Sequence, residues 1–395
     1  MRRRMDTDSY KEAGETEYMR IAIDLLWLRP GKVGGTEVYT RNLLDGFARS
    51  TEKFEFVLLV SQDNAETFVK YAKDSRFTLL EAKVTSANIA GRIIWQNIFE
   101  SSFLRKNGLL KCFVPVYCRP MFNGGVMYIN TLHDIQAYHY PEYHPFHENV
   151  YSRLDWWAIA HFTEHIITIS RFVKDDFQKY YHVDPERITV LSEAVEVQED
   201  KVADFALVEE KYGIQRQMYF YTVSQCIPHK NFKTLIEVFR TIRDNHIDLP
   251  CKLLVSGISG NASKEMTDLI RQYRLEENVI MTGYVADNVR DCLYKNARAY
   301  LFPSVFEGFG ISPVEAMFYG VPVITTKCAS IPEVTRDKAE YVNDPYSVDE
   351  WIEKMKNPVI RYQRADLDCY NSDAVAGRYL EYIQKVTAEN VNEKI

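Results

Sequence analysis

The chain has 395 residues, a length that predicts two domains rather than one. Hydrophobic residues make up 46% of it and charged residues 26%, which is the composition of an ordinary globular protein. The formal net charge of −7 leaves no global basic field, so the composition excludes a general nucleic-acid binder.

The cysteines and the N-terminus indicate the compartment. Seven cysteines are dispersed without a C-x-x-C pair or a zinc spacing, which is typical of free thiols in a reducing compartment. Residues 1–18 begin with MRRRM and lack the apolar segment of a signal peptide, so we expect a disordered extension. No stretch approaches the roughly 18 apolar residues of a membrane-spanning helix, and we expect a cytoplasmic protein.

The first half of the chain alternates strands with helices. Apolar stretches predict strands at 19–28, 54–60, 124–134, 164–170 and 187–191. Helical spacing predicts helices at 36–49, 91–107 and 171–181, and another through Trp156 and Trp157. This order of elements is typical of an α/β domain with a parallel sheet.

The second half repeats the pattern, with strands expected at 218–224, 251–257, 278–284 and 298–304 and helices at 231–245, 262–275 and 289–297. The polar stretch near residues 194–216 has no strand pattern, and we place the linker there. We therefore expect an N-terminal Rossmann-like domain at 19–200 and a C-terminal one at 215–365. Residues 366–395 form a tail with a helical pattern at 377–390.

Polar and glycine residues follow several of the expected strands. Gly34 and Gly35 follow the first strand, His133 and Asp134 end the third, and Lys230 and Glu307 follow strands of the second half. Open parallel sheets bind ligands beyond the carboxyl ends of their strands. The positions therefore predict one cleft between the two domains, lined by these groups.

Residues 302–326 carry the most specific pattern in the chain. Glu307 and Glu315 stand eight residues apart, with Gly308 and Gly310 between them. The spacing predicts a loop followed by a helix with Ser312 at the N-cap, Pro313 at N1 and Glu315 at N3. Glycines and a helix start offer backbone N–H groups to an anion, and the two acids suit sugar hydroxyls. A plain capping box would give the same residues without any ligand.

The run FPSVFEGFGISPVEAM…GVPVI closely resembles the E-x7-E segment of retaining family-four glycosyltransferases, which have the GT-B fold. The elements RIIWQ and TLHDI resemble the N-terminal half of polysaccharide mannosyltransferases in that family. The resemblance implies two Rossmann-like domains facing a cleft and transfer of a hexose from a nucleotide-diphosphate sugar to a glycan. GDP-mannose is the first donor expected, and the tail helix should pack back on the N-terminal domain.

The resemblance also implies roles for single residues. Lys230, in a P-x-K-N element, would meet the diphosphate, Glu307 the sugar and Glu315 the ribose. His133 and Asp134 would contact the donor sugar or the acceptor, so the expected catalytic residues are His133, Asp134, Lys230 and Glu307. The remaining donor-binding residues implied are Gly34, Gly35, Ser224, Tyr284, Val285, Gly308, Phe309, Gly310 and Ile311.

One position departs from the family pattern. Relatives often carry an arginine six residues before the lysine, where this chain has Ser224. Another cation would then have to serve, and His229, Arg171 and Lys174 are the candidates. Weaker neutralisation of the phosphates is the alternative.

Cofactors and further partners are constrained by absent motifs. No G-x-G-x-x-G fingerprint appears, so NAD is not expected. We expect metal-independent transfer, and a zinc site at His139, His144 and His147 is disfavoured because no cysteine or HExxH partner accompanies them.

A lipid-linked acceptor and a weak contact with the inner face of the membrane through 91–107 stay open. A sugar phosphorylase or sugar-nucleotide processing enzyme and a non-catalytic nucleotide-sugar binder are the alternative functions.

Overall fold

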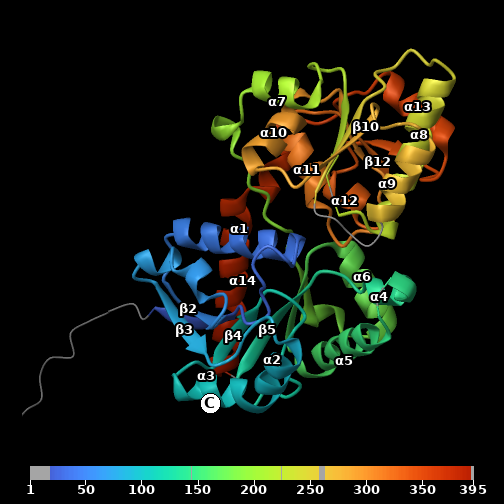
Figure 1. Cartoon of the computed structure of the whole chain (residues 1–395). Helices are drawn as coiled ribbons and strands as arrows, with labels where there is room; N and C mark the ends of the chain where they lie inside the picture. Colours follow the sequence, from blue (N-terminus) through green and yellow to red (C-terminus); the bar gives the residue numbers. More distant parts are fainter. Residues whose placement is uncertain (1–17, 144, 224, 258–262, 393–395) are drawn as a thin grey trace, which may run out of the picture.

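The computed structural model describes residues 18–143, 145–223, 225–257 and 263–392, which form two lobes (Figure 1). Each lobe is built on one sheet whose paired strands all run parallel. The expected pair of α/β domains with parallel sheets is thereby confirmed.

The N-terminal sheet has seven strands in the order β3-β2-β1-β4-β5-β6-β7. These are Phe77–Ala82, Phe54–Ser61, Met19–Asp24, Lys111–Val114, Met127–Leu132, His165–Thr168 and Ile188–Val190. The first strand is shorter than the expected 19–28, because the chain turns after Asp24 and its carboxylate accepts the N–H of Leu26 at 2.9 Å. β3 and β4 were not predicted from the sequence.

The C-terminal sheet has six strands in the order β10-β9-β8-β11-β12-β13. These are Val279–Gly283, Leu253–Ser256, Phe220–Val223, Ala299–Phe302, Val323–Thr326 and Glu340–Val342. In both sheets the strand order reverses once, between β1 and β4 and between β8 and β11. Such reversals leave a crevice at the carboxyl ends of the two central strands, where ligands of this fold class bind.

Helices cover the sheets of both lobes (Figure 1). They are α1 Gly35–Arg49, α2 Ile89–Trp95, α3 Ser101–Lys106, α4 Gln136–His139, α5 Phe146–Phe162, α6 Arg171–Tyr181, α7 Phe205–Tyr212, α8 Phe232–Asp244, α9 Ser263–Gln272, α10 Asp287–Asn296, α11 Ile311–Phe318, α12 Ile331–Val334, α13 Val348–Lys356 and α14 Ser372–Asn392. The helix expected at 91–107 is interrupted, since a π-helical turn at Gln96–Glu100 lies between α2 and α3.

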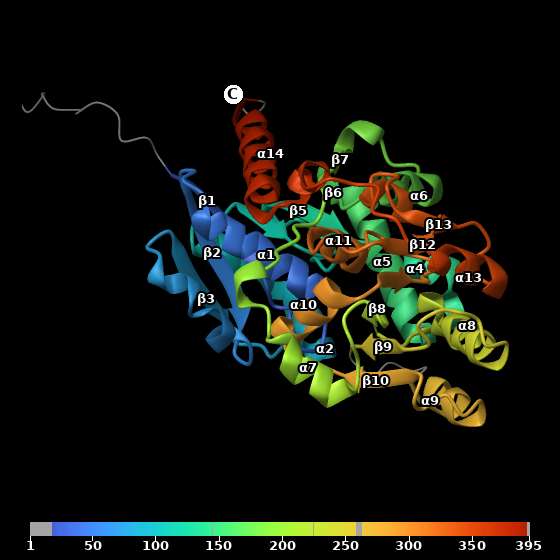
Figure 2. The same cartoon turned by 90° about the horizontal axis from the view of Figure 1, so that it is seen from above.

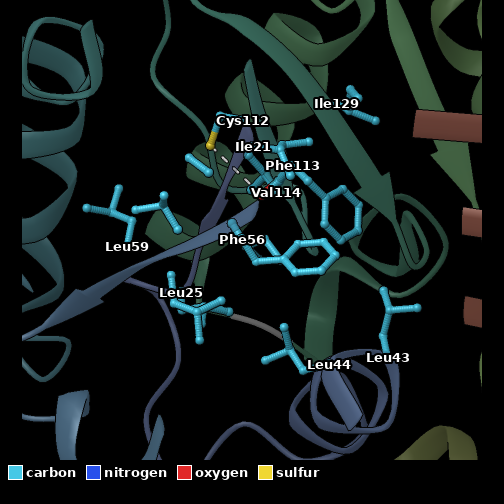
Figure 3. Packing of buried hydrophobic residues seen from close by; sticks show 14 of the residues in the cluster. Ile21, Leu25, Leu43, Leu44, Phe56, Leu59, Cys112, Phe113, Val114 and Ile129 are labelled. Atoms are coloured by element: carbon cyan, nitrogen blue, oxygen red, sulfur yellow. Dashed lines mark hydrogen bonds between the residues drawn. The ribbon is translucent and has the colours of Figure 1, made fainter. Parts of the chain in front are cut away.

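Buried apolar side chains fill the space between each sheet and its helices. In the N-terminal lobe, Ile21, Phe56 and Phe113 from neighbouring strands pack with Leu43 and Leu44 of α1 (Figure 3). The period of two along the strands and of 3.6 along α1 brings these side chains to one interface. This core fixes the carboxyl ends of β1, β4 and β5, from which the loops of the site begin.

The C-terminal helix α14 packs on the N-terminal lobe beside α1 (Figures 1 and 2). The approach is close, because a Cβ added at Gly46 of α1 would lie 2.6 Å from the Cβ of Ala376. The hydroxyl of Tyr39 donates to that of Tyr379 at 3.1 Å. The chain thus crosses between the lobes twice, and an isolated bridge joins Val195 to Asn371 where the two crossings meet.

Candidate active site

Lys230 and Glu307 come from the two strands at the reversal point of the C-terminal sheet. Lys230 ends a 3₁₀ turn, Pro228–Lys230, in the loop after β8, and Glu307 lies in the loop after β11. The Lys230 Nζ and the Glu307 Oε1 are 2.6 Å apart, with side chains 15% and 11% exposed. The Nζ also lies 5.9 Å from the centre of the Phe302 ring. A cation and a carboxylate therefore share the floor of the crevice.

The glycine loop leads from Glu307 directly into α11. Gly310 is the N-cap, with φ 95° and ψ 68°, and no side chain caps the helix. The expected N-cap at Ser312 is therefore wrong: the left-handed conformation of Gly310 starts the helix two residues earlier, and Ser312 lies inside its first turn. Ile311 and Ser312 line the crevice, and the first N–H groups of a helix have no intrahelical acceptor, so this helix start offers hydrogen-bond donors to an anion.

The N-terminal lobe supplies the opposite wall. Gly34, with φ 63°, is the N-cap of α1, and Gly35 is its first residue. The amide of Gln225 from the C-terminal lobe reaches this loop, since a Cβ added at Gly34 would lie 3.3 Å from its Nε2. The carboxylate of Asp134 accepts the N–H of Gln136 at 2.9 Å, which holds the turn after β5.

Contacts between the lobes converge on Gly308. A Cβ added at Gly308 would lie 1.9 Å from the carbonyl oxygen of His133, so only glycine permits this approach. The Oγ of Ser170, the N-cap of α6, donates to the Gly308 carbonyl at 2.6 Å. The carboxylate of Glu333 on α12 accepts the N–H groups of Arg171 and Phe172 at 2.9 and 3.2 Å. The start of α6 thereby holds the glycine loop that follows Glu307 against the N-terminal lobe.

Both ring nitrogens of His133 bond to acceptors within the protein. Nδ1 lies 3.0 Å from Glu193 Oε1, and Nε2 lies 2.8 Å from the Pro115 carbonyl. Burial lowers the pKa of His133. The hydrogen bond and charge of Glu193 and the carbonyl of Pro115 raise it by more, so the pKa lies above the ordinary value. Since Glu193 and Pro115 occupy both ring nitrogens, neither is free for a ligand.

One cavity of about 370 Å³ gathers these groups, which is within the roughly 300–1,000 Å³ of small-molecule sites. Its lining includes ten residues that the sequence predicted, namely Gly34, Gly35, His133, Asp134, Lys230, Glu307, Gly308, Phe309, Gly310 and Ile311. It also includes residues that the sequence did not single out for a ligand, which are Val33, Thr36, Ile169, Glu193, Gln225, Phe302 and Ser312. Residues from both lobes thus meet around one space.

Three predicted donor-binding residues lie outside this lining. Glu315 is buried, and its Oε2 accepts the hydroxyl of Tyr294 at 3.0 Å. Burial raises the pKa of Glu315 although Arg290 and Tyr294 oppose the rise. Tyr284, 75% exposed, and Val285 follow β10 at the edge of the sheet. Ser224 lies outside the described residues.

The candidate cations for the arginine position also lie elsewhere. Arg171 borders a second cavity with Glu333, and the Lys174 Nζ donates to the carbonyls of Pro185 and Ile188 at 2.9 and 2.8 Å. His229 is buried. Among the described residues that line the main cavity, Lys230 is the single lysine or arginine.

Two of the three histidines of the aromatic loop, His139 and His147, lie within the described residues. His139 Nε2 pairs with Asp176 at 2.6 Å, His147 is exposed, and His144 lies outside the described residues. Across residues 18–392, apart from the undescribed positions, no group of three or more His, Cys, Asp or Glu side chains could hold a metal ion. None of the helices in the described part of the chain has the length and apolarity needed to cross a membrane.

Comparison with known proteins identifies the class. Residues 33–199 match the family model for Glycosyltransferase Family 4, and residues 205–360 match that for Glycosyl transferases group 1. The chain belongs to the family-four glycosyltransferases, and its two lobes form the GT-B fold.

Two relatives are O-antigen chain mannosyltransferases. RfbU from Salmonella typhimurium is 31% identical over 227 residues, which cover 58% of this chain and 59% of that protein. O-antigen chain mannosyltransferase B from Escherichia coli is 30% identical over 224 residues, covering 56% and 58%. The chain thus matches somewhat over half the length of each relative.

Solved structures share the fold. Sucrose-phosphate synthase from Thermosynechococcus elongatus superposes with a TM-score of 0.70 at 14% identity, covering 94% of this chain and 100% of that one. HepE from Anabaena, solved with UDP and glucose, gives a TM-score of 0.64 at 15% identity, covering 95% and 100%. At these identities the likeness concerns the fold alone.

Proposed function

We propose that the protein is a retaining hexosyltransferase that moves a sugar from a nucleotide-diphosphate donor to a hydroxyl of a glycan. The observation that carries the proposal is the cavity in which Lys230, the start of α11 and Glu307 meet the N-terminal wall of Gly34 and Gly35. The cation and the backbone N–H groups suit the diphosphate of a nucleotide sugar, and the carboxylate suits its sugar ring.

The chemistry needs these groups because charge separates as the bond from the anomeric carbon to the diphosphate breaks. Negative charge grows on the leaving phosphate, and the Lys230 ammonium with the N–H groups of Ile311 and Ser312 meets it. Positive charge grows on the sugar ring, which the carboxylate of Glu307 faces. The acceptor oxygen attacks from the face that the diphosphate leaves and passes its proton to the departing phosphate oxygen, which gives retention.

Mannose is the sugar we propose, with GDP-mannose as donor and a growing surface glycan as acceptor. The two O-antigen chain mannosyltransferases support this assignment, since they match the chain over more than half of its length. We further propose that the ribose is held by Glu315 and the base by Tyr284 and Val285, which lie beyond the cavity on the same lobe.

We also propose that a lipid-linked acceptor brings the protein to the inner face of the membrane. Ile94, Ile98, Phe99 and Phe122 are exposed apolar side chains. The loop that carries Phe122 lies beside the π-helical turn, because the Met121 N–H donates to Asn97 at 2.8 Å. The exposed Arg105 and Lys106 follow on α3, so sedimentation with anionic vesicles but not with neutral ones would support this contact.

The transfer reaction itself is tested with purified protein, GDP-mannose and a mannose-containing oligosaccharide. The proposal expects GDP release that depends on the acceptor, with retention at the anomeric centre of the product. A requirement for inorganic phosphate would identify a sugar phosphorylase instead. Donor binding by calorimetry without release in any mixture would identify a non-catalytic binder and overturn the proposal.

A further inference from the structure

Glu193 is a carboxylate of the cavity wall to which the sequence pattern assigned no role. It lies three residues beyond the end of β7, the edge strand of the N-terminal sheet, and is only 5% exposed. It lines the same cavity as Lys230 and Glu307 but from the opposite lobe. A buried carboxylate is costly unless it is paired, so its surroundings must compensate for lost hydration.

Only one of its two oxygens is used within the protein. Oε1 accepts from the Nδ1 of His133 at 3.0 Å. Oε2 has no hydrogen-bond partner in the described part of the chain. It is also not one of the solvent-inaccessible polar atoms without a partner, so it is accessible. Since Glu193 lines the cavity, Oε2 opens onto that space as an acceptor without a donor.

His133 fixes the direction of the Glu193 carboxylate. The imidazole ring is fixed from its other side by the Pro115 carbonyl at 2.8 Å, and the Tyr39 ring packs edge-on against it with centroids 4.7 Å apart. The Tyr39 hydroxyl in turn bonds to Tyr379 of α14. This packing leaves the imidazole no freedom to turn toward a ligand, so it acts by holding Glu193.

The pair also lies directly against the glycine loop that follows Glu307. The carbonyl oxygen of His133 touches Gly308, whose neighbour Glu307 provides the carboxylate of the other wall. Glu193 and Glu307 therefore face one cavity from different lobes, and of these two only Glu307 is paired with a lysine. A purely structural ion pair would have no need to leave one oxygen open to the cleft.

We propose that Glu193 binds the transferred sugar, accepting a hydroxyl of the hexose ring on Oε2 and facing the positive charge that develops on that ring. His133 is then a positioning residue that acts through Glu193. This assignment rests on the proposed glycosyl transfer and adds a second carboxylate contact to it, on the side of the sugar away from Glu307.

The test separates sugar contacts from nucleotide contacts. Glu193→Gln keeps the size of the side chain but removes its charge, and Glu164→Gln is the matched control because Glu164 is exposed and precedes β6 at the opposite end of the sheet. Calorimetry is run with GDP and GDP-mannose, and with UDP and UDP-glucose, followed by donor turnover. Thermal unfolding checks that each variant is folded.

We expect Glu193→Gln to bind the nucleoside diphosphate like wild type but to lose about tenfold or more in affinity for the intact nucleotide sugar and in turnover. Glu164→Gln should change neither. Equal affinity and turnover in wild type and Glu193→Gln would overturn the inference and leave a structural ion pair. Failure of the wild type to bind any nucleoside diphosphate would instead count against the proposed function.

A second measurement needs no variant. In wild-type protein labelled with ¹⁵N-histidine, the intact nucleotide sugar should shift the His133 ring signals, whereas the nucleoside diphosphate alone should leave them nearly in place. Equal shifts with both ligands would contradict the contact between Glu193 and the sugar.

Discussion

The ammonium of Lys230 and the carboxylate of Glu307 form an ion pair of 2.6 Å across the reversal point of the C-terminal sheet. The two residues come from loops 77 positions apart in the chain, and both side chains are largely buried. The pair compensates the charges of both groups within the protein. In the proposed reaction, a diphosphate entering the cleft would share Lys230 with Glu307, and the two groups would then meet opposite parts of the donor.

Removing either partner should reduce turnover at least tenfold, a barrier change of about 1.4 kcal/mol or more. Lys230→Ala should also weaken binding of the nucleoside diphosphate, because the phosphate loses its cation. Glu307→Ala should bind the nucleoside diphosphate as well as wild type and lose affinity for the sugar. Calorimetry and initial rates measure both effects.

Lys233→Ala is the control for this pair, since Lys233 is an exposed lysine on the first turn of α8 close to the same loop. The double variant Lys230→Ala/Glu307→Ala should lose less than the two single effects combined, because the residues are in contact. Wild-type rates in both single variants would refute the assignments.

Gly308→Ala should abolish turnover while leaving each lobe folded. A Cβ at this position would stand 1.9 Å from the backbone oxygen of His133, and backbone cannot move aside as a flexible side chain would. The loop must then separate from the N-terminal lobe, which opens the cleft. Gly377→Ala on α14, where nothing lies within 4 Å, is the control and should keep full activity.

Small-angle scattering distinguishes this opening from unfolding. We expect a larger radius of gyration for Gly308→Ala than for wild type, with unchanged circular dichroism. A variant with both wild-type dimensions and wild-type turnover would show that the approach of Gly308 to His133 is dispensable.

The sequence predicted the α/β class and much of the cavity lining because both depend on local patterns. Apolar runs such as that of Phe54–Ser61 appear as buried strands, and ligand-binding groups follow strand ends in any open parallel sheet. Phe77–Ala82 was missed because it is an edge strand with exposed positions, and Lys111–Val114 because its apolar run stops at Pro115 after three residues.

What the sequence could not predict depends on which loops face each other. Glu193 lies just before the expected linker, and it was not singled out because the preceding strand has only three residues and gave little signal of a strand end. His133 was expected to reach a ligand through its ring, but Glu193 and Pro115 occupy both nitrogens. The helix start moved from Ser312 to Gly310 because backbone conformation, rather than a capping side chain, begins α11.

Turnover should persist in the presence of a chelator. The proposed transfer assigns neutralisation of the diphosphate to Lys230 and to the N–H groups at the start of α11, which bind the phosphates without a bridging ion. Initial rates after dialysis against EDTA should match those of untreated enzyme, and added Mg²⁺ should not restore Lys230→Ala. Loss of activity on dialysis with recovery on adding a divalent ion would contradict this prediction.

The stability that Glu193 contributes should depend on pH. The pKa of His133 is raised above its ordinary value in the folded protein, despite burial, by Glu193 and Pro115. A group whose pKa is higher in the folded than in the unfolded state stabilises the fold when it is protonated. This stabilisation is fully present below the unfolded pKa, about 6.5 for histidine, and is lost as the pH rises through the folded pKa. The difference in free energy of unfolding between wild type and Glu193→Gln should therefore be largest in mildly acidic buffer and shrink in alkaline buffer. Urea unfolding at several pH values measures it, with Glu164→Gln as the control, and a difference that stays constant across the range would show that His133 is not charged by its contact with Glu193.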